Sequence, residues 1–268
     1  WSSWEDLGHK SLAVNLSDIA AMGGVARYAL VALSCPGDVE SDDVLQYYRG
    51  MCALAAKHGV SVIGGNLTSS PFVSSTVFVT GEAREDRLLR RSAAVPGELV
   101  AVTGELGRAS TALSLLSHPA ANPAPHVPQE MLTGLVRPEP RLRESLILSE
   151  EGVRCAIDIS DGLVADLGHI SDCSGVCATV EAGRVPVSIA CAKASPGAMH
   201  LALTGGEDYE LLFTCSNQQF DRIRDRLACR VTAIGRIDVA ASTPAVSVLD
   251  AGGRAFDVRA GGWNHFGR

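Results

Sequence analysis

The stretch IDISDGL, residues 157–163, places two carboxylates, Asp158 and Asp161, three positions apart, with a serine between them and a glycine directly behind. The apolar residues 155–157 predict the end of a buried strand, and residues 163–170 have apolar side chains at helical spacing. The two acids are therefore expected on a strand-to-helix loop. In open α/β sheets this is the edge at which ligands bind. Because Asp, Ser and Gly are also the ordinary residues of turns and helix caps, a plain turn and a metal site both remain open at this point.

Length and composition describe a globular chain that can bury one or two hydrophobic cores. Its 268 residues are 46% hydrophobic, which suits one large or two ordinary domains. No apolar run approaches the roughly 18 residues that span a bilayer, and no signal segment opens the printed sequence, so we expect a soluble, cytoplasmic protein without a membrane partner. The eight scattered cysteines form no zinc-binding pattern and are expected to be reduced. A net charge of −7 argues against nucleic-acid binding, and it means that phosphates would be bound with the help of cations.

Helix-like and strand-like patterns alternate along the chain and predict the α/β (α+β) class with two domains. The charged stretch 84–97 closes on Pro-Gly and is the best domain boundary. We therefore expect residues 1–95 to form an N-terminal domain and residues 96–268 to form a larger C-terminal domain.

Individual elements follow from the same patterns. After the short apolar segment 12–16, Ser17 is expected to cap a helix that ends near residue 23. This would place Asp18 in a first turn, where the helix dipole favours a carboxylate. The Pro-rich segment 118–128 is expected to be a mobile loop. Further helices are expected at 41–58, 109–116, 163–170 and 218–227, and strands at 28–34, 61–65, 75–80, 99–103, 155–157, 201–203, 211–213, 231–234 and 246–249.

Two other loops strengthen the metal hypothesis. Residues 64–66, Gly-Gly-Asn, follow a short strand, and glycine there would let the backbone approach a ligand, although a tight turn is the simpler interpretation. The segment GGEDYE, residues 205–210, carries three acids, which repel one another and usually persist because a cation or polar ligand holds them. Carboxylates without thiolate or imidazole clusters suit Mg²⁺ and indicate phosphoryl transfer. Neither a P-loop nor the HRD and DFG motifs of protein kinases occur, so ATP would bind on another fold.

Five segments resemble, in the same order, the motifs of the thiamine-monophosphate kinases. They are KSLAVNLSDIAAMGG (10–24), VIGGN (62–66), AIDISDGLVADLGHI (156–170), LTGGEDYELLFT (203–214) and GGWNHF (261–266). The DxSDGL element alone indicates only the wider family of aminoimidazole ribonucleotide synthetase-like ATP-binding proteins. NLSDIAAMG and GGEDYELLFT are narrower, and the resemblance extends over the whole chain.

The resemblance implies both a fold and a reaction. In the fold it implies, the N-terminal sheets of two subunits join into the barrel-like core of a homodimer, and ATP and Mg²⁺ lie between the two domains of a subunit. The reaction it implies converts ATP and thiamine monophosphate to thiamine diphosphate and ADP. The nucleophile would be the substrate's own phosphate, which is largely dianionic near neutral pH and needs no base. Catalysis would then consist of positioning and of charge neutralisation by metal ions and Arg91.

By position within the motifs, the resemblance assigns three groups of site residues. The metal ligands are Asp18, Asp158, Asp161 and Asn66; the ATP contacts are Tyr48, Gly65, Asn66, Arg91 and Ser160; the thiamine contacts are Glu207 and Trp263; and Asp161, Asp158 and Arg91 are the catalytic residues. Glu207 would oppose the positive charge of the thiazolium, and Trp263 would offer it a ring face. Tyr48, Arg91 and Trp263 also have structural interpretations, as a core aromatic, a solvated charge and a packing residue.

Two departures from the family pattern carry expectations of their own. The family's chain begins earlier, with a Gly-Asp-Asp loop and a Val-His pair, so we expect this sequence to lack a leading segment that supplies further ligands. Asn66 stands where the family often has aspartate, and an amide oxygen can still coordinate a metal, which predicts one weaker or missing Mg²⁺ position. Two alternatives stay open: a sister ATP-dependent enzyme of the same fold, and a catalytically silent nucleotide-binding scaffold.

Overall fold

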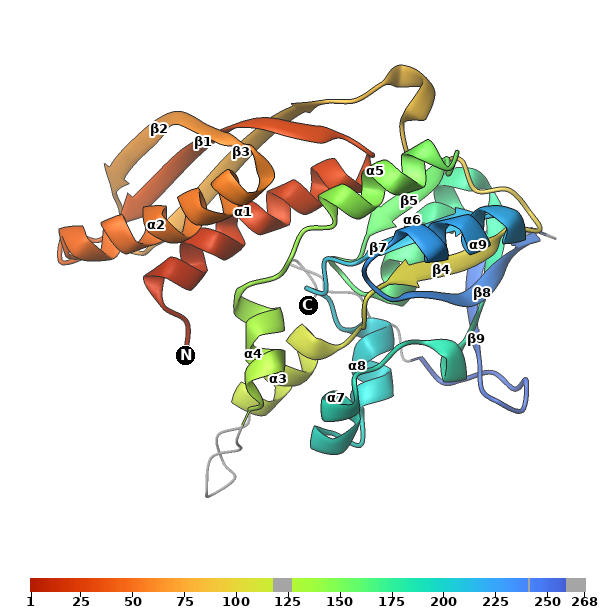
Figure 1. Cartoon of the computed structure of the whole chain (residues 1–268). Coiled ribbons are helices and arrows are strands. Elements are labelled where there is room, and N and C mark those ends of the chain that lie inside the picture. The colour runs from red at the N-terminus through yellow and green to blue at the C-terminus, as the bar shows by residue number, and fades with distance from the viewer. Residues whose placement is uncertain (118–126, 241, 259–268) are drawn as a thin grey trace.

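Two β-sheets organise the molecule, one in each part of the chain (Figure 1). The computed structural model describes residues 1–117, 127–240 and 242–258. The helices are α1 (Trp4–Ala21), α2 (Ser41–His58), α3 (Arg108–Leu116), α4 (Gln129–Val136), α5 (Leu142–Glu150), α6 (Leu163–Ser174), α7 (Ile189–Ala194), α8 (Ala198–Thr204) and α9 (Asn217–Arg226). The strands are β1 (Val25–Cys35), β2 (Ser61–Ser69), β3 (Ser74–Glu82), β4 (Leu99–Thr103), β5 (Cys155–Asp158), β6 (Val176–Glu181), β7 (Leu211–Cys215), β8 (Val231–Val239) and β9 (Ala245–Leu249). Among the described residues, no helix has both the length and the apolar character of a membrane span.

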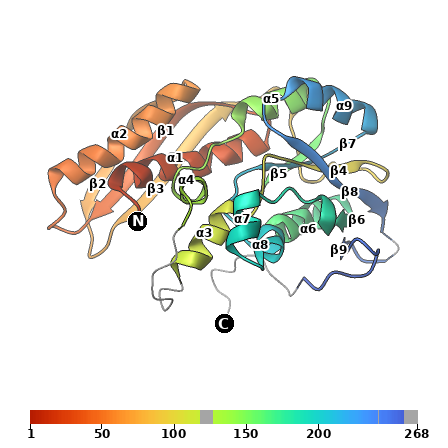
Figure 2. The same cartoon turned by 60° about the horizontal axis from the view of Figure 1, so that its bottom comes forward.

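The smaller sheet has the order β2-β1-β3 and carries helices α1 and α2 on one face (Figures 1 and 2). The central strand β1 is parallel to β2 and antiparallel to β3. Its buried residues Ala29, Val31 and Leu33 belong to the core beneath the helices, and the alternate residues Tyr28 and Leu30 are exposed on the other face. This alternation is the period of two that a half-buried strand requires. The sheet therefore has one packed face and one open face.

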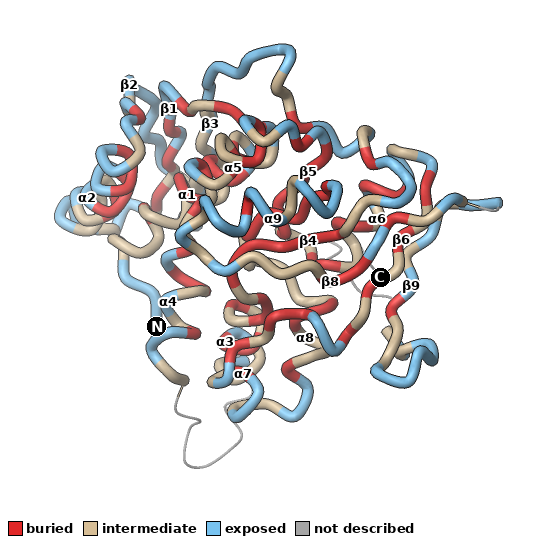
Figure 3. Tube along the Cα trace, turned by 45° about the vertical axis from the view of Figure 1, so that its right-hand side comes forward, coloured by how far each residue is buried: buried red, intermediate tan, exposed pale blue. Residues whose placement is uncertain are grey.

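The larger sheet has the order β5-β7-β4-β8-β6-β9 and is covered on both faces. Ala101 of β4 and Phe213 of β7 belong to the core that includes residues of α5, α9 and α1. Val102 and Leu212, one position along from them, belong to a second core with residues of α6. Figure 3 shows buried residues along the strands of this sheet. Because the first core takes residues from α1 and from the larger sheet, the two parts of the chain share one hydrophobic interior.

Antiparallel pairing of β5 with β7 brings two predicted loops together. Asp158, the last residue of β5, is the register partner of Leu211, the first residue of β7. The loop that leaves β5 and the loop that enters β7 must therefore emerge at the same edge of the sheet. Residues 159–162 and 205–210 thus lie side by side although they are distant in sequence.

The expected start of the first helix was wrong. α1 is one continuous helix that begins after Ser3, whose hydroxyl accepts from the backbone N–H of Asp6 in a capping box. The apolar residues Leu12, Leu16 and Ala20 recur every fourth position along it and are buried. Asp18 accordingly lies in the last turn of a helix, where the helix dipole disfavours a carboxylate.

The strand expected at 201–203 was also wrong, because these residues form part of helix α8. Three apolar residues are too few for periodicity to distinguish a strand from a buried helix. The helix expected at 41–58 is confirmed as α2, and the strand expected at 155–157 is confirmed within β5. Residues 118–126 of the predicted mobile loop lie outside the described residues.

Glu139 links the two parts of the chain and predicts a pH-dependent stability. Its carboxylate lies 2.5 Å from Lys57 Nζ and 3.5 Å from His58 Nε2 at the end of α2, and these neighbours lower the pKa of Glu139 to about 2. The resulting stabilisation is present above the unfolded pKa of about 4.5 and is lost as the pH falls toward 2. Solvent screening limits it to about 1 kcal/mol.

We expect Glu139→Gln to lower the free energy of unfolding at pH 7 by about 1 kcal/mol. The difference from the parent protein should shrink as the pH is lowered through the range below 4.5, as measured by urea unfolding at several pH values. Glu82→Gln is the matched control, because its 3.4 Å contact with Arg27 is exposed. Equal stability of Glu139→Gln and the parent at pH 7 would contradict the prediction.

Candidate active site

Three of the predicted carboxylates meet where two cavities adjoin. Asp18 comes from α1, Asp158 from the end of β5 and Asp161 from the loop that follows. Together with Ser160, all three line a cavity of about 570 Å³, which we call the Tyr209 cavity. The same four residues also line a second cavity of about 480 Å³, which we call the Arg91 cavity. A group bound at these carboxylates would therefore face both cavities.

The two cavities differ in the chemistry of their walls. Beyond the shared residues, the Tyr209 cavity is lined mainly by the apolar and aromatic side chains of Val14, Ala109, Leu113 and Tyr209. Its two further polar groups are Ser110 and Glu207. In addition to its acids, the Arg91 cavity is lined by two cations, Arg90 and Arg91, which are both exposed. The first cavity suits a flat organic ligand, and the second suits a polyanion.

The loop 205–210 clamps the loop that carries Asp161. The backbone N–H of Glu207 donates to the carbonyl of Ser160 at 2.9 Å, and that of Tyr209 donates to the carbonyl of Ile159 at 2.9 Å. A Cβ atom on Gly206 would lie 2.1 Å from the Ser160 carbonyl, so only glycine permits this approach. Glu207 and Tyr209 have φ of 70° and 51°, in the left-handed region that residues with a Cβ atom rarely adopt. Such strain, of order 1–3 kcal/mol per residue, is typical of functional sites.

Burial and mutual repulsion make the carboxylates of Asp18 and Asp158 costly to ionise. Burial raises the pKa of Asp158, although Ser17 Oγ donates to its Oδ2 at 2.6 Å. Burial and the nearby charge of Asp158 raise the pKa of Asp18 to about 6. A group of hard oxygen donors that repel one another fits a divalent cation such as Mg²⁺, which neutralises them. Asp18, Asp158 and Asp161 are therefore the residues that could hold one.

The three acids of GGEDYE are held by the protein itself, which corrects the inference that their density requires a bound ligand. Glu207 Oε2 accepts from Lys10 Nζ at 2.8 Å. Asp208 accepts from the backbone N–H of Gly107 at 3.0 Å, at the start of α3. Glu210 forms a two-point ion pair with Arg141. These partners are 69 to 197 positions away in sequence, so no local signal could identify them.

Several predicted site residues lie elsewhere. Tyr48 is in the middle of α2, edge-on against Tyr47 and packed on the first core. Gly65 and Asn66 are exposed on β2 of the smaller sheet. Among the described residues, none of these lines either cavity. Trp263 lies outside the described residues.

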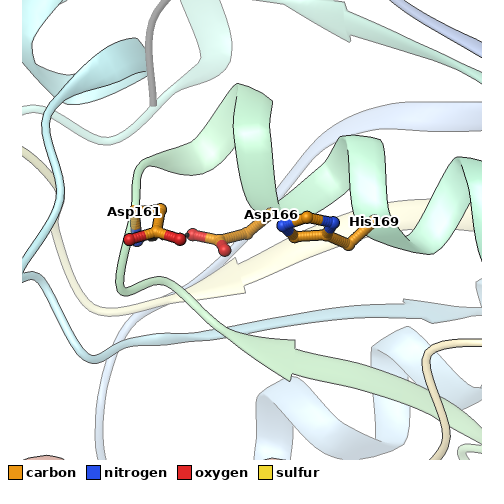
Figure 4. A group of neighbouring side chains, drawn as sticks. All are labelled: Asp161, Asp166 and His169. Carbon is orange, nitrogen blue, oxygen red and sulfur yellow. Dashed lines mark hydrogen bonds between the residues drawn. The ribbon is translucent and has the colours of Figure 1, made fainter. Parts of the chain in front are cut away.

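Sequence reasoning missed three residues of the Arg91 cavity, Arg90, Asp166 and His169. Asp161, Asp166 and His169 offer ligand atoms within 4.8 Å of one another. Figure 4 shows the carboxylates of Asp161 and Asp166 facing each other, with the His169 ring beyond them. The spacing of Asp166 and His169, three apart on a helix that starts at the motif, is the signal that could have found them.

Comparison with known proteins identifies the class first. Residues 2–83 match the family described as AIR synthase related protein, N-terminal domain. Hydrogenase maturation protein HypE in complex with ATP shares the fold, with a TM-score of 0.77 at 17% identity over 93% of this chain and 78% of that chain. Residues 2–83 therefore form an AIR synthase-related N-terminal domain, in a chain that shares the HypE fold.

More similar relatives define the family within this class. Thiamine-monophosphate kinase of Bacillus subtilis (strain 168) is 34% identical over 99% of this chain and 83% of its own length. The crystal structure of thiamine-monophosphate kinase from Stenotrophomonas maltophilia K279a has a TM-score of 0.84 at 37% identity, over 92% of this chain and 79% of that one. AaThiL complexed with AMPPCP and TMP has a TM-score of 0.85 at 30% identity, over 98% and 81%. The chain belongs to the thiamine-monophosphate kinase family.

The cluster of Asp18, Asp158 and Asp161 is expected to lower stability without a cation and to bind a cation when one is present. In the presence of a chelator, Asp18→Asn should raise the melting temperature by a few degrees, equivalent to about 1 kcal/mol, because it removes one of the like charges. Excess MgCl₂ with AMPPCP should stabilise the parent protein strongly and the variant little. Differential scanning calorimetry measures both effects. Asp172→Asn, on the exposed side of α6, is the charge-matched control. A destabilised Asp18→Asn that keeps the full cation effect would contradict this prediction.

Proposed function

We propose that the protein transfers the γ-phosphoryl group of ATP to the phosphate of thiamine monophosphate, giving thiamine diphosphate and ADP. The observation that carries the proposal is the position of Asp18, Asp158 and Asp161 at the junction of two cavities. A reaction between a triphosphate and a phosphate monoester needs such a place, where both anions meet the same positive charge. The family relation and the AaThiL complex with AMPPCP and TMP support the same pair of substrates.

The cavity walls assign one substrate to each side. Arg90 and Arg91 would bind the triphosphate in the Arg91 cavity, which extends from the acids to Met22 and His169. The apolar wall of the Tyr209 cavity would hold the rings of thiamine monophosphate, with its phosphate toward Asp161. Ser160, which lines both cavities, would contact the phosphates between them.

The residues perform this chemistry by positioning rather than by proton transfer. An oxygen of the substrate phosphate, with a second pKa of about 6, already carries the electron pair that forms the new P–O bond. The bond between the γ-phosphorus and the bridging oxygen breaks, and ADP leaves with that electron pair. Mg²⁺, when bound, would neutralise phosphate charge. Asp18, Asp158 and Asp161 would hold it, and Arg91 would add a positive charge beside the triphosphate.

Glu207 and Trp263 are proposed to bind the thiamine part. Glu207 lines the Tyr209 cavity, and the hydrogen bond from Lys10 goes to its Oε2, so its Oε1 can oppose the thiazolium charge. The roles of Trp263 in stacking on the thiazolium and of Tyr48, Gly65 and Asn66 in binding ATP rest on the resemblance alone. A cytoplasmic location likewise stays a prediction.

The test is the formation of thiamine diphosphate by the full-length protein from thiamine monophosphate, ATP and MgCl₂, with ADP measured in parallel. We expect equal amounts of the two products. Calorimetric titration with AMPPCP, with and without MgCl₂, separates the alternatives. ADP without thiamine diphosphate would indicate a sister enzyme. Nucleotide binding that is independent of Mg²⁺, without any product, would indicate a silent scaffold.

We also propose that the open face of the smaller sheet binds a second copy of the chain. This face carries large apolar side chains, with Tyr28 49%, Leu30 42% and Phe78 62% exposed, and Leu30 pairs with Phe78 across β1 and β3. An exposed apolar sheet face of this kind marks an interface. A second copy presents the same face, so the contact is self-complementary about a two-fold axis.

A charge on this face should therefore produce monomers. We expect Phe78→Glu to sediment as a monomer where the parent protein sediments as a dimer, because two carboxylates would be buried near the axis. Val239→Glu, which changes a 74% exposed apolar residue at the end of β8, should leave the dimer intact. A monomeric parent protein, or a dimeric Phe78→Glu, would overturn the proposed dimer.

A further inference from the structure

The loop before α6 has the form of an anion-binding site. A strand that passes through a glycine-containing turn into a helix leaves backbone N–H groups free at the helix N-terminus, and many proteins bind phosphate with them. Residues 159–162 connect β5 to α6 in this way and line both cavities through Ser160 and Asp161. These N–H groups are therefore the first candidates for binding the phosphates of a nucleotide.

In this structure those donors already have an acceptor. The backbone N–H groups of Ser160, Asp161 and Gly162 all donate to one atom, Oδ2 of Asp166, at 3.1, 3.1 and 3.0 Å. The N–H of Ile159 donates to the carbonyl of Glu210 at 2.9 Å. Every backbone donor of residues 159–162 is thus used inside the protein, and none remains for a phosphate.

Asp166 is built into this position. It lies in the first turn of α6, where the helix dipole favours a negative charge, and its side chain points back to the loop. Only 2% of the residue is exposed, so it is not a solvated surface acid. On the opposite side, Glu207 and Tyr209 bind the loop carbonyls of Ser160 and Ile159. The loop is consequently fixed from both sides, and only its side chains reach the cavities.

We infer that Asp166 is a positioning residue of the site: its carboxylate occupies the anion position at the N-terminus of α6 and thereby fixes Ser160 and Asp161 toward the cavities. Phosphates then bind through cations rather than through the backbone N–H groups of this loop, which explains why the nucleotide site needs Asp161 and Arg91 where a P-loop uses its loop backbone. The inference rests on the proposed function for its kinetic readout only.

The experiment compares three variants in the full-length protein. Asp166→Ala removes the acceptor, Asp166→Asn keeps one oxygen that the three N–H groups can share, and Ile170→Ala creates a cavity at a fully buried site on the same helix while leaving the Asp166 carboxylate in place. The readouts are the Mg²⁺ concentration that half-saturates AMPPCP binding by calorimetry and the one that half-saturates turnover.

We expect Asp166→Ala to raise both Mg²⁺ half-saturation concentrations about 10-fold or more, in the range of residues that orient metal ligands. Sodium formate, which can occupy the vacated acceptor position, should restore part of the loss. Asp166→Asn should stay within about threefold of the parent. Ile170→Ala should lower the melting temperature without changing the Mg²⁺ dependence, because it weakens the helix alone.

Two results would overturn the inference. The first is that Asp166→Ala loses stability as Ile170→Ala does but keeps the Mg²⁺ dependence of the parent protein. Asp166 would then have a structural role only. If Asp166→Ala does not fold, the deciding result is Asp166→Asn: rapid amide exchange at Asp161 and Gly162 in this variant would show that the retained oxygen does not hold the loop. Failure of the proposed function looks different, because the parent protein would bind AMPPCP with Mg²⁺ and form no thiamine diphosphate.

Discussion

Asp161→Asn is expected to lower kcat/KM for thiamine diphosphate formation by about 10³-fold, equivalent to about 4 kcal/mol of transition-state stabilisation. Asp161 lines both cavities and lies between the two proposed phosphate sites. Asparagine has the same shape but removes the charge that would hold a divalent cation there. Because the repulsion between the two phosphates is the main obstacle to reaction, the loss should fall on the transition state as well as on binding.

Steady-state kinetics with both substrates varied measure this effect. Asp172→Asn removes one charge from the exposed side of the same region and should retain nearly full activity. Circular dichroism and the melting temperature verify that Asp161→Asn is folded, and we expect it to be at least as stable as the parent without metal. A variant that keeps more than about a tenth of the parent activity would remove Asp161 from the catalytic residues.

Arg141→Met is expected to lower the free energy of unfolding by about 3–5 kcal/mol. Arg141 Nε and Nη2 donate to the two oxygens of Glu210 at 2.7 and 2.5 Å, and Thr103 Oγ1 donates to Glu210 Oε2 at 2.6 Å. Glu210 is only 6% exposed. Burial would lower the pKa of Arg141, but the hydrogen bonds to Glu210 and the negative charges beside it together raise the pKa. Removal of the cation leaves a buried carboxylate without its counter-ion.

Urea unfolding at pH 7 measures the loss, and a double variant tests its cause. Arg141→Met with Glu210→Met removes both charges and should be clearly more stable than Arg141→Met alone, because apolar residues of similar size often replace a buried ion pair without loss. Arg222→Met, which breaks an exposed pair with Glu151 at 2.6 Å, should cost no more than about 1 kcal/mol. If the double variant is as unstable as the single one, the uncompensated charge is not the cause.

Local sequence patterns predicted the elements that present the site. The IDISDGL stretch forms the strand, loop and helix that its periodicity indicates, and residues 41–58 form a helix as expected. Both depend on neighbours within a few positions, where dihedral preferences and spacing of apolar residues decide the outcome. The same reasoning failed at α1, where the expected N-cap Ser17 lies inside a continuous helix, and at α8, where a short apolar run fits a strand and a buried helix equally well.

Long-range packing decided what each acid does. Asp18 and Asp158 come together because α1 packs against β5, with Ser17 donating to Asp158 across 141 positions. Of the acids in GGEDYE, Glu207 pairs with Lys10 and lines the Tyr209 cavity, while Glu210 pairs with Arg141 and is buried, a distinction that composition cannot make. The sequence by itself determined which residue types stand at the ends of β5 and before β7. Only the tertiary structure decided which of those charges meet a protein cation and which meet each other, because Coulomb energies depend on distance and burial in the folded chain.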